Sequence, residues 1–110
     1  MDERDRDLLE AIAAAGRLAL GYVREQGPGW LDDPKTVDAV AKRVDEVGEL
    51  AKRVRPEVLT AIPDVDWRGG KAFREVLAHG YGDLDRDVLA DIVATRLPGL
   101  VEAVERTLRA

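Results

Sequence analysis

Apolar residues recur at intervals of three and four along most of the chain, which is the spacing of helices that bury one face. The first such run extends from Glu3 to Gln26 and is ended by Gly27, Pro28 and Gly29. Its apolar positions are Leu8, Leu9, Ile12, Ala15, Ala19, Leu20 and Val23. The pattern therefore predicts a long amphipathic helix over residues 3–26.

A second run has a well-marked start, because Asp33 can cap a helix and Pro34 suits the first helical turn. Its apolar positions are Val37, Val40, Ala41, Val44, Val47, Ala51 and Val54. We expect this helix to reach Val54, shortly before Pro56.

Residues 56–65 are expected to connect this helix to the next one. Pro56, Pro63 and a turn at Asp64 interrupt any longer helix. Residues 57–62 leave room for one short helix.

A third main helix can be capped by Asp66 and pass through Trp67 and Phe73 to His79. Gly80 suits the left-handed position that ends many helices.

A fourth helix is expected to begin near Asp83 or Asp85, and Pro98 should kink or divide it. Its apolar positions are Val88, Leu89, Ile92, Val93, Leu97, Leu100, Val101, Val104 and Leu108. No segment alternates with period two over a useful length. The predicted fold is an all-α, up-and-down bundle of four to five helices, in a single domain over residues 1–110.

The composition agrees with a folded helical domain and limits its chemistry. At 110 residues the chain can bury one substantial core, and 35% charged with 45% apolar residues is typical of a helix-rich fold. It has no cysteine and one histidine, so thiolate metal sites and multi-histidine zinc sites within one chain are excluded. We therefore expect no metal or other cofactor.

The net charge of -5 argues against a general nucleic-acid coat, because such binding needs basic residues that neutralise phosphates. Any contact with RNA must be local. The first ten residues are acid-rich and the longest apolar stretch is interrupted by Arg17. We expect a cytoplasmic protein without a membrane span.

The ionisable residues of the expected third helix share one side. At about 100° per residue, the buried stripe of this helix consists of Phe73, Val76 and Leu77. The opposite, polar arc consists of Lys71, Glu75, Arg68 and His79, with Arg74 at its edge. His79 should therefore point away from the core of its own chain.

Purely structural roles for this polar arc remain open. His79 can interact with the dipole at the C-terminal end of the helix. Lys71 and Glu75 can form an exposed pair one turn apart, and Arg68 can lie idle in solvent.

The spacing of Arg74, His79 and Tyr81 follows the pattern R-x-x-x-x-H-x-Y. VGEL and IPDVDW precede this motif, and HGYGDLDRDVLADIV and LPGL continue from it. On these residues the chain resembles the HepT-like toxins of the HEPN superfamily of helical ribonucleases, over roughly residues 30–108.

This resemblance implies a small HEPN-like homodimer in which Arg74 and His79 of both chains meet across a two-fold axis and cleave RNA, such as tRNA or mRNA, without a metal. It also implies a toxin whose cognate MntA-like nucleotidyltransferase antitoxin silences it by transferring AMP to Tyr81. The alternative for Tyr81 is packing under a helix end. Arg68 and Lys71 could line a local groove for RNA.

One residue departs from the family pattern. The position after the motif arginine is commonly Asn, Asp or another small polar residue, and here it is Glu75. A carboxylate one turn before His79 could raise the pKa of the histidine by favouring imidazolium, or pair with Lys71 or Arg68 instead. The resemblance therefore leaves the full activity open.

Metal-free cleavage of RNA needs a base, an acid and positive charge beside the phosphorus. One chain supplies one histidine, but a residue near a two-fold axis meets its own copy, so a dimer supplies two. Arg74 offers the planar, permanently charged fork that suits a phosphate.

Two further points stay open. The cluster Lys52, Arg53 and Arg55 could extend a groove for RNA or be a solvated helix end. The whole chain could instead be a non-catalytic helical partner, or substrate-binding subunit, of a nucleotidyltransferase. A plain dimerisation bundle would leave the shared side of the ionisable residues unexplained.

Overall fold

The computed structural model describes residues 1–67 and 85–110, and every regular element among these residues is helical. The elements are α1 (Glu3–Gln26), the 3-10 turn η1 (Trp30–Asp32), α2 (Pro34–Ala51), α3 (Pro56–Thr60), α5 (Arg86–Asp91), the π-helical turn η2 (Ile92–Arg96) and α6 (Leu97–Arg109). The predicted all-α fold is confirmed for this part of the chain.

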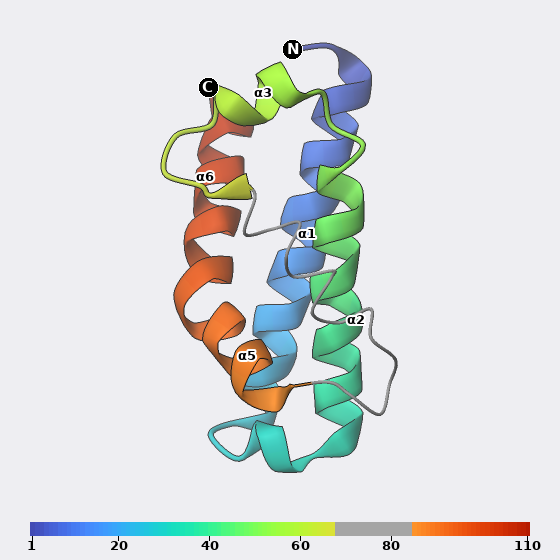
Figure 1. Cartoon of the computed structure of the whole chain (residues 1–110), viewed down its shortest axis with the longest axis vertical. Coiled ribbons are helices and arrows are strands. Elements are labelled where there is room, and N and C mark those ends of the chain that lie inside the picture. The colour runs from blue at the N-terminus through green and yellow to red at the C-terminus, as the bar shows by residue number, and fades with distance from the viewer. Residues whose placement is uncertain (68–84) are drawn as a thin grey trace.

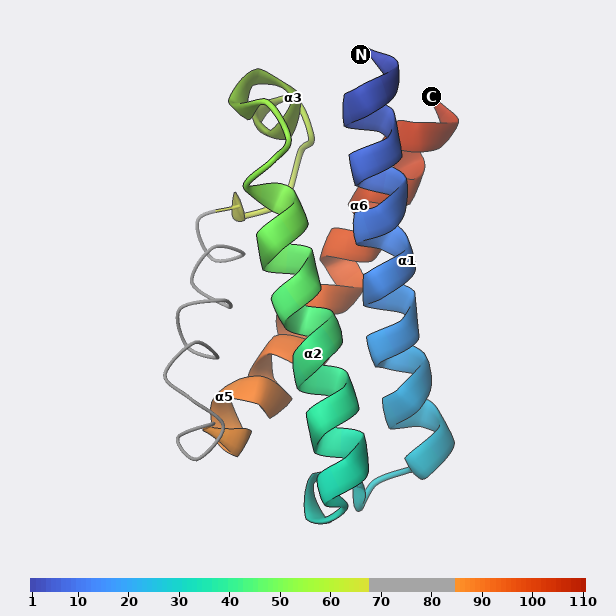
Figure 2. The ribbon, with the colours of Figure 1, turned by 90° about the vertical axis from the view of Figure 1, so that its right-hand side faces the viewer.

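Helix α1 lies between the other two long helices and packs against both α2 and α6. The chain reverses direction between α1 and α2, so these two helices form an antiparallel pair (Figure 1). The turned view shows α3 above the end of α2, at the same end of the bundle as both termini (Figure 2).

The core forms where the apolar stripes of the three long helices meet. Leu9 and Ile12 of α1, Val40 and Val44 of α2, and Val104 of α6 have no exposed surface. All five belong to the apolar positions predicted from the sequence. Burial of these stripes is the main favourable contribution to folding.

The ends of α1 and the start of α2 follow local signals in the sequence. Asp2 caps α1 and accepts a hydrogen bond from the N–H of Asp5. Gly27 ends α1 with a φ of 88°, a conformation that glycine adopts without steric cost. The Asp33 carboxylate caps α2 by accepting from the N–H of Thr36, as predicted.

Helix α2 ends at Ala51 and not at Val54, so the predicted end of this helix is wrong by three residues. Arg55 precedes Pro56 and is extended, with φ -61° and ψ 136°. A residue before proline avoids the helical conformation. The helix therefore ends before Arg55, in a turn that begins at Lys52. Val54 is nevertheless buried, with 3% of its surface exposed.

The predicted fourth helix is divided, as expected from Pro98. Asp85 caps its first part, α5, and accepts hydrogen bonds from the N–H groups of Asp87 and Val88. The wide turn η2 follows, and the N–H of Leu97 bonds the carbonyl of Ile92, five residues earlier. Proline has no N–H to continue an α-helical ladder, which explains why the break lies here.

Gly16 allows α1 and α6 to approach each other closely, a contact that the apolar pattern does not indicate. A methyl group built on Gly16 would overlap the side chain of Val101. The absence of a side chain at this position therefore sets how near the two helices lie.

The third predicted helix lies outside the described residues, except for Asp66 and Trp67 at its start. None of the helices in residues 1–67 and 85–110 combines the length and the apolar character that crossing a membrane requires.

Candidate functional site

The residues predicted to carry the chemistry all lie outside the described residues. They are Arg68, Lys71, Arg74, Glu75, His79 and Tyr81. What the structure describes is the protein on both sides of this segment, and the basic cluster at the end of α2.

Trp67 stands at the start of the segment and is partly buried against the core. Its indole N–H is buried and has no hydrogen-bond partner within the described part of the chain. Asp64, three residues earlier, has a φ of 67°. This left-handed conformation suits the turn that was predicted there.

A cleft of about 230 Å³ lies beside the loop that leads to Trp67. It is lined by Asp64, Val65, Asp66, Thr95, Arg96, Gly99 and Leu100. The loop therefore faces the π-helical turn and the first turn of α6, which are far away in the sequence. Thr95 is held there because its hydroxyl donates to the carbonyl of Asp91 at 2.7 Å.

The chain is also fixed on the other side of the segment. Arg86, the first residue of α5, donates a hydrogen bond from Nη1 to the carbonyl of Leu31, at 3.1 Å. Leu89, one turn later, is completely buried. These contacts hold the start of α5 against the turn that joins α1 to α2.

Arg55 differs from the other two residues of its basic cluster, Lys52 and Arg53, because its side chain forms an ion pair with Asp5. Nε of Arg55 donates to Oδ2 of Asp5 at 2.6 Å, and its backbone N–H donates to Oδ1 at 3.3 Å. Asp2 and Glu57 add longer ion pairs with Arg55, at 3.5 and 3.8 Å. Arg55 therefore joins the connection after α2 to the first turn of α1.

Asp5 has 1% of its surface exposed, yet its pKa is held below its usual range. Burial has the largest single effect on this pKa and raises it, because burial disfavours the charged form. The hydrogen bonds from Arg55 and its positive charge lower the pKa, and together they outweigh the effect of burial. The same contacts raise the pKa of Arg55, with the side-chain hydrogen bond to Asp5 as the main cause.

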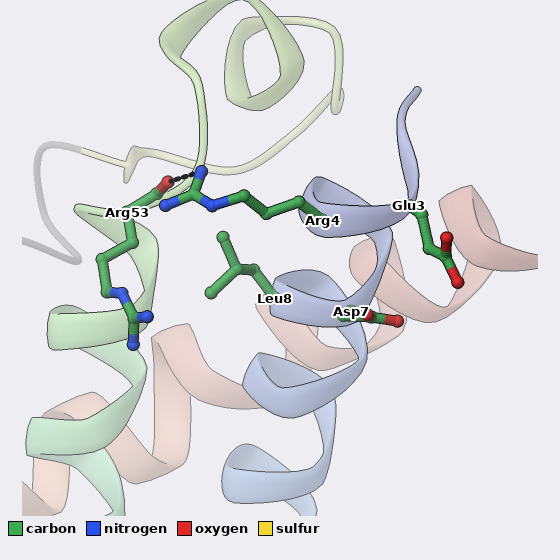
Figure 3. Close-up of a pocket in the computed structure, with 5 residues that line it drawn as sticks. All are labelled: Glu3, Arg4, Asp7, Leu8 and Arg53. Atoms are coloured by element: carbon green, nitrogen blue, oxygen red, sulfur yellow. Dashed lines mark hydrogen bonds between the residues drawn. The ribbon is translucent and has the colours of Figure 1, made fainter.

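Arg53 has a different neighbour, Arg4 of α1, whose Nη1 donates to the carbonyl of Arg53 at 3.2 Å. A shallow pocket of about 450 Å³ is lined by these two arginines with Glu3, Asp7 and Leu8 (Figure 3). Arg4 is 49 residues away from Arg53, so the spacing along the chain gave no sign of this contact. Only the antiparallel packing of α1 and α2 brings them together.

A comparison with known protein families shows which family this helical bundle belongs to. Residues 8–107 match the family described as Ribonuclease HepT-like. The chain belongs to the HepT-like ribonuclease family. Arg74, His79 and Tyr81 all lie within the matched residues, so the resemblance found from the motif is confirmed at the level of the family.

Two relatives support this membership of the HepT-like family. A protein of Thermococcus cleftensis named "Probable ribonuclease HepT" is 31% identical over 107 residues, which cover 96% of this chain and 97% of that protein. A protein of Methanocaldococcus jannaschii named "Putative RNase MJ0127" is 28% identical over 80 residues, which cover 73% of this chain. The match spans 66% of that second relative, slightly under two thirds of its length. No solved structure gives a significant match.

Proposed function

We propose that this protein is the ribonuclease toxin of a toxin–antitoxin pair and that it cleaves RNA without a metal. The observation that supports this most is membership of the HepT-like family over residues 8–107, a range that contains Arg74, His79 and Tyr81. Both relatives described above carry ribonuclease names.

In the proposed reaction, two chains pair about a two-fold axis and form one composite site. One His79 removes the proton of a ribose 2′-hydroxyl, and the 2′ oxygen attacks the adjacent phosphorus. The other His79 protonates the departing 5′ oxygen, which leaves a 2′,3′-cyclic phosphate. Arg74 stabilises the additional charge on the phosphate oxygens. Arg68 and Lys71 are proposed to support the binding of RNA.

Glu75 has a proposed influence on the proton transfers. If its carboxylate faces His79, it favours the imidazolium form and raises the pKa of the acid partner. If it pairs with Lys71 or Arg68, the histidine is unaffected by it. Glu75→Gln separates these arrangements, because only the first one predicts that the pH of maximal cleavage moves downwards.

The proposed regulation acts at Tyr81. A nucleotidyltransferase antitoxin catalyses attack of the tyrosine oxygen on the α-phosphorus of ATP, with release of pyrophosphate. The resulting AMP group occupies space beside the site and repels the phosphates of RNA. Mass spectrometry after co-expression with the antitoxin tests this, with Tyr81→Phe as the variant that should gain no AMP.

The experiment that tests the activity is expression of the wild type and of His79→Ala, separately, in bacteria. Growth arrest with fragmented RNA is expected for the wild type alone. Purified wild type should also cut RNA in excess EDTA. Arg24→Gln, an exposed arginine on α1, is a matched control that should keep the activity.

A different outcome would favour the second candidate, a non-catalytic helical partner of a nucleotidyltransferase. That role predicts tight binding of the partner, intact RNA, and no difference in cells between the wild type and His79→Ala.

A further inference from the structure

Several arginine side chains of the described residues are already paired with carboxylates. Arg6, Arg17, Arg43, Arg55 and Arg106 form ion pairs with carboxylates. Within the described part of the chain, no ion pair is formed by Arg4, Arg24, Lys35, Lys42, Lys52, Arg53 or Arg109. Two of these, Arg4 and Arg53, are held together by the hydrogen bond between Arg4 and the carbonyl of Arg53.

The side chains around this contact separate by charge. Figure 3 shows Arg4, Leu8 and Arg53 on the side of α1 that faces α2, whereas Glu3 and Asp7 point away from them. One N–H of Arg4 is used by the carbonyl of Arg53. A guanidinium group has five N–H donors, so Arg4 keeps most of them for another acceptor.

We propose that Arg4 and Arg53, with Lys52 next to Arg53 in the chain, bind phosphates of the RNA backbone away from the reacting bond. This rests on the proposed function, and it concerns the binding of the substrate and not its cleavage. A protein with a net charge of -5 needs local positive groups to hold a polyanion, and these two arginines, which form no ion pair within residues 1–67 and 85–110, meet that need.

The lining of the pocket indicates contact with phosphates and not recognition of bases. It is shallow, and none of its five residues is aromatic, so it offers no surface on which a base can stack. Guanidinium groups can form paired hydrogen bonds with phosphate oxygens. We therefore expect the contact to be independent of RNA sequence.

Salt dependence measures such a contact directly. We would compare binding of a mixed-sequence, single-stranded RNA by full-length His79→Ala protein with and without the double change Arg4→Gln and Arg53→Gln. Each lost phosphate contact lowers the slope of log K against log salt concentration by about 0.7. If each arginine contacts one phosphate, the magnitude of this slope should therefore be smaller by about 1.4 in the double variant.

A matched control is available at the opposite ends of the same two helices. The double change Arg24→Gln and Lys35→Gln also removes two charges, one from α1 and one from α2, and should leave the slope unchanged. In protein with an intact His79, the Arg4 and Arg53 double variant should cut long RNA less efficiently but a dinucleotide as well as the wild type does.

An equal loss of slope in both double variants, or no loss in either, would overturn the proposal of a local contact. If the wild type cuts RNA and the Arg4 and Arg53 variant behaves as the wild type does, the ribonuclease function stands and only this inference fails. If the wild type neither binds nor cuts RNA, both fail. If Arg4→Gln prevents folding, the single change Arg53→Gln still tests the proposal. It keeps the hydrogen bond from Arg4, because Arg53 accepts that bond through its backbone carbonyl.

Discussion

Asp5 is a carboxylate that remains charged although it is almost completely buried. Its position is tolerable because Arg55 supplies two hydrogen bonds and a charge, while the Arg55 side chain itself stays half exposed. A buried charge without such a partner would be strongly unfavourable. The pair also fixes the connection after α2 to the start of α1, so it contributes to the geometry of that end of the bundle.

The lowered pKa of Asp5 predicts part of the acid sensitivity of the protein. Because the pKa is below its ordinary value of 3.8 in the folded state, the unfolded state binds a proton first as the pH falls. The stabilisation from Asp5 is therefore present above pH 3.8 and lost as the pH falls through and below it. Asp5→Asn should be less stable than the wild type at neutral pH, and the difference should shrink in acid.

Urea unfolding at a series of pH values measures this effect. Asp7→Asn is the control, because it removes an exposed carboxylate from the same part of α1. A difference between the wild type and Asp5→Asn that stays constant from neutral pH to below pH 3.8 would contradict the assignment.

Two glycines of α1 should respond in opposite ways to replacement by alanine. Gly21 has open space where a methyl group would be added, so Gly21→Ala should raise the free energy of unfolding by about 0.5–1 kcal/mol. At Gly16 the added methyl overlaps the short, stiff side chain of Val101. Overpacking of this kind costs about 1–3 kcal/mol, which should exceed the gain in helix propensity.

Denaturant unfolding of both variants tests this difference, and Gly16→Ala with Val101→Ala tests its cause. The second change removes the atoms that overlap, so the two effects should be far from additive. Equal stabilisation by Gly16→Ala and Gly21→Ala would mean that α1 and α6 are not in close contact.

Between the helices α5 and α6, the π-helical turn η2 compensates for a difference in direction between their two apolar stripes. At about 100° per residue, a continuous α-helix would place the stripe of Leu89, Ile92 and Val93 about 80° away from that of Leu97, Leu100, Val101 and Val104. A π-helical turn contains one additional residue, equivalent to about 100°, which offsets this angle to within about 20°. Both α5 and α6 can then bury their apolar sides in the same core.

If η2 aligns the two stripes, one residue can be deleted from this turn without loss of the fold. Removal of Ala94, which is exposed, together with Pro98→Ala should give one continuous α-helix with aligned stripes. Deletion of the exposed Lys42 from α2 is the control, because it rotates two halves of a regular stripe by about 100°. Circular dichroism and thermal unfolding should show a cooperative transition for the first deletion and its loss for the second.

The helices of the described residues were predictable because their signals are local. Asp33, Gly27 and Asp85 act within one turn of their own positions, and the apolar periodicity fixes which face is buried. The end of α2 was predicted wrongly because Val54 keeps the apolar pattern and is buried in a turn instead of a helix. Burial was predicted correctly there, and conformation was not.

The surroundings of the candidate site were less predictable, because they depend on contacts between distant residues. Lys52, Arg53 and Arg55 look equivalent in the sequence, but Asp5 removes Arg55 from the cluster and Arg4 joins Arg53. Neither partner can be found from spacing along the chain. The motif of Arg74, His79 and Tyr81 was recognised by its pattern, and its geometry stays a prediction.

For the whole molecule, the number of histidines makes the proposed reaction depend on association. Each chain has one histidine, whereas the mechanism uses one as base and one as acid. A dimer with a single composite site therefore needs an intact His79 from both chains. A dimer of one wild-type and one His79→Ala subunit should be nearly inactive.

Mixing experiments distinguish this arrangement from independent sites. If subunits of the wild type and His79→Ala are mixed equally and allowed to exchange, about a quarter of the dimers contain two wild-type chains. The cleavage rate should then follow the square of the wild-type fraction, whereas independent sites give a linear decrease. Equal mixing with Arg109→Gln subunits, which keep His79, should leave the rate unchanged. A linear decrease with His79→Ala would show that one chain suffices for both proton transfers, and the composite site would have to be abandoned.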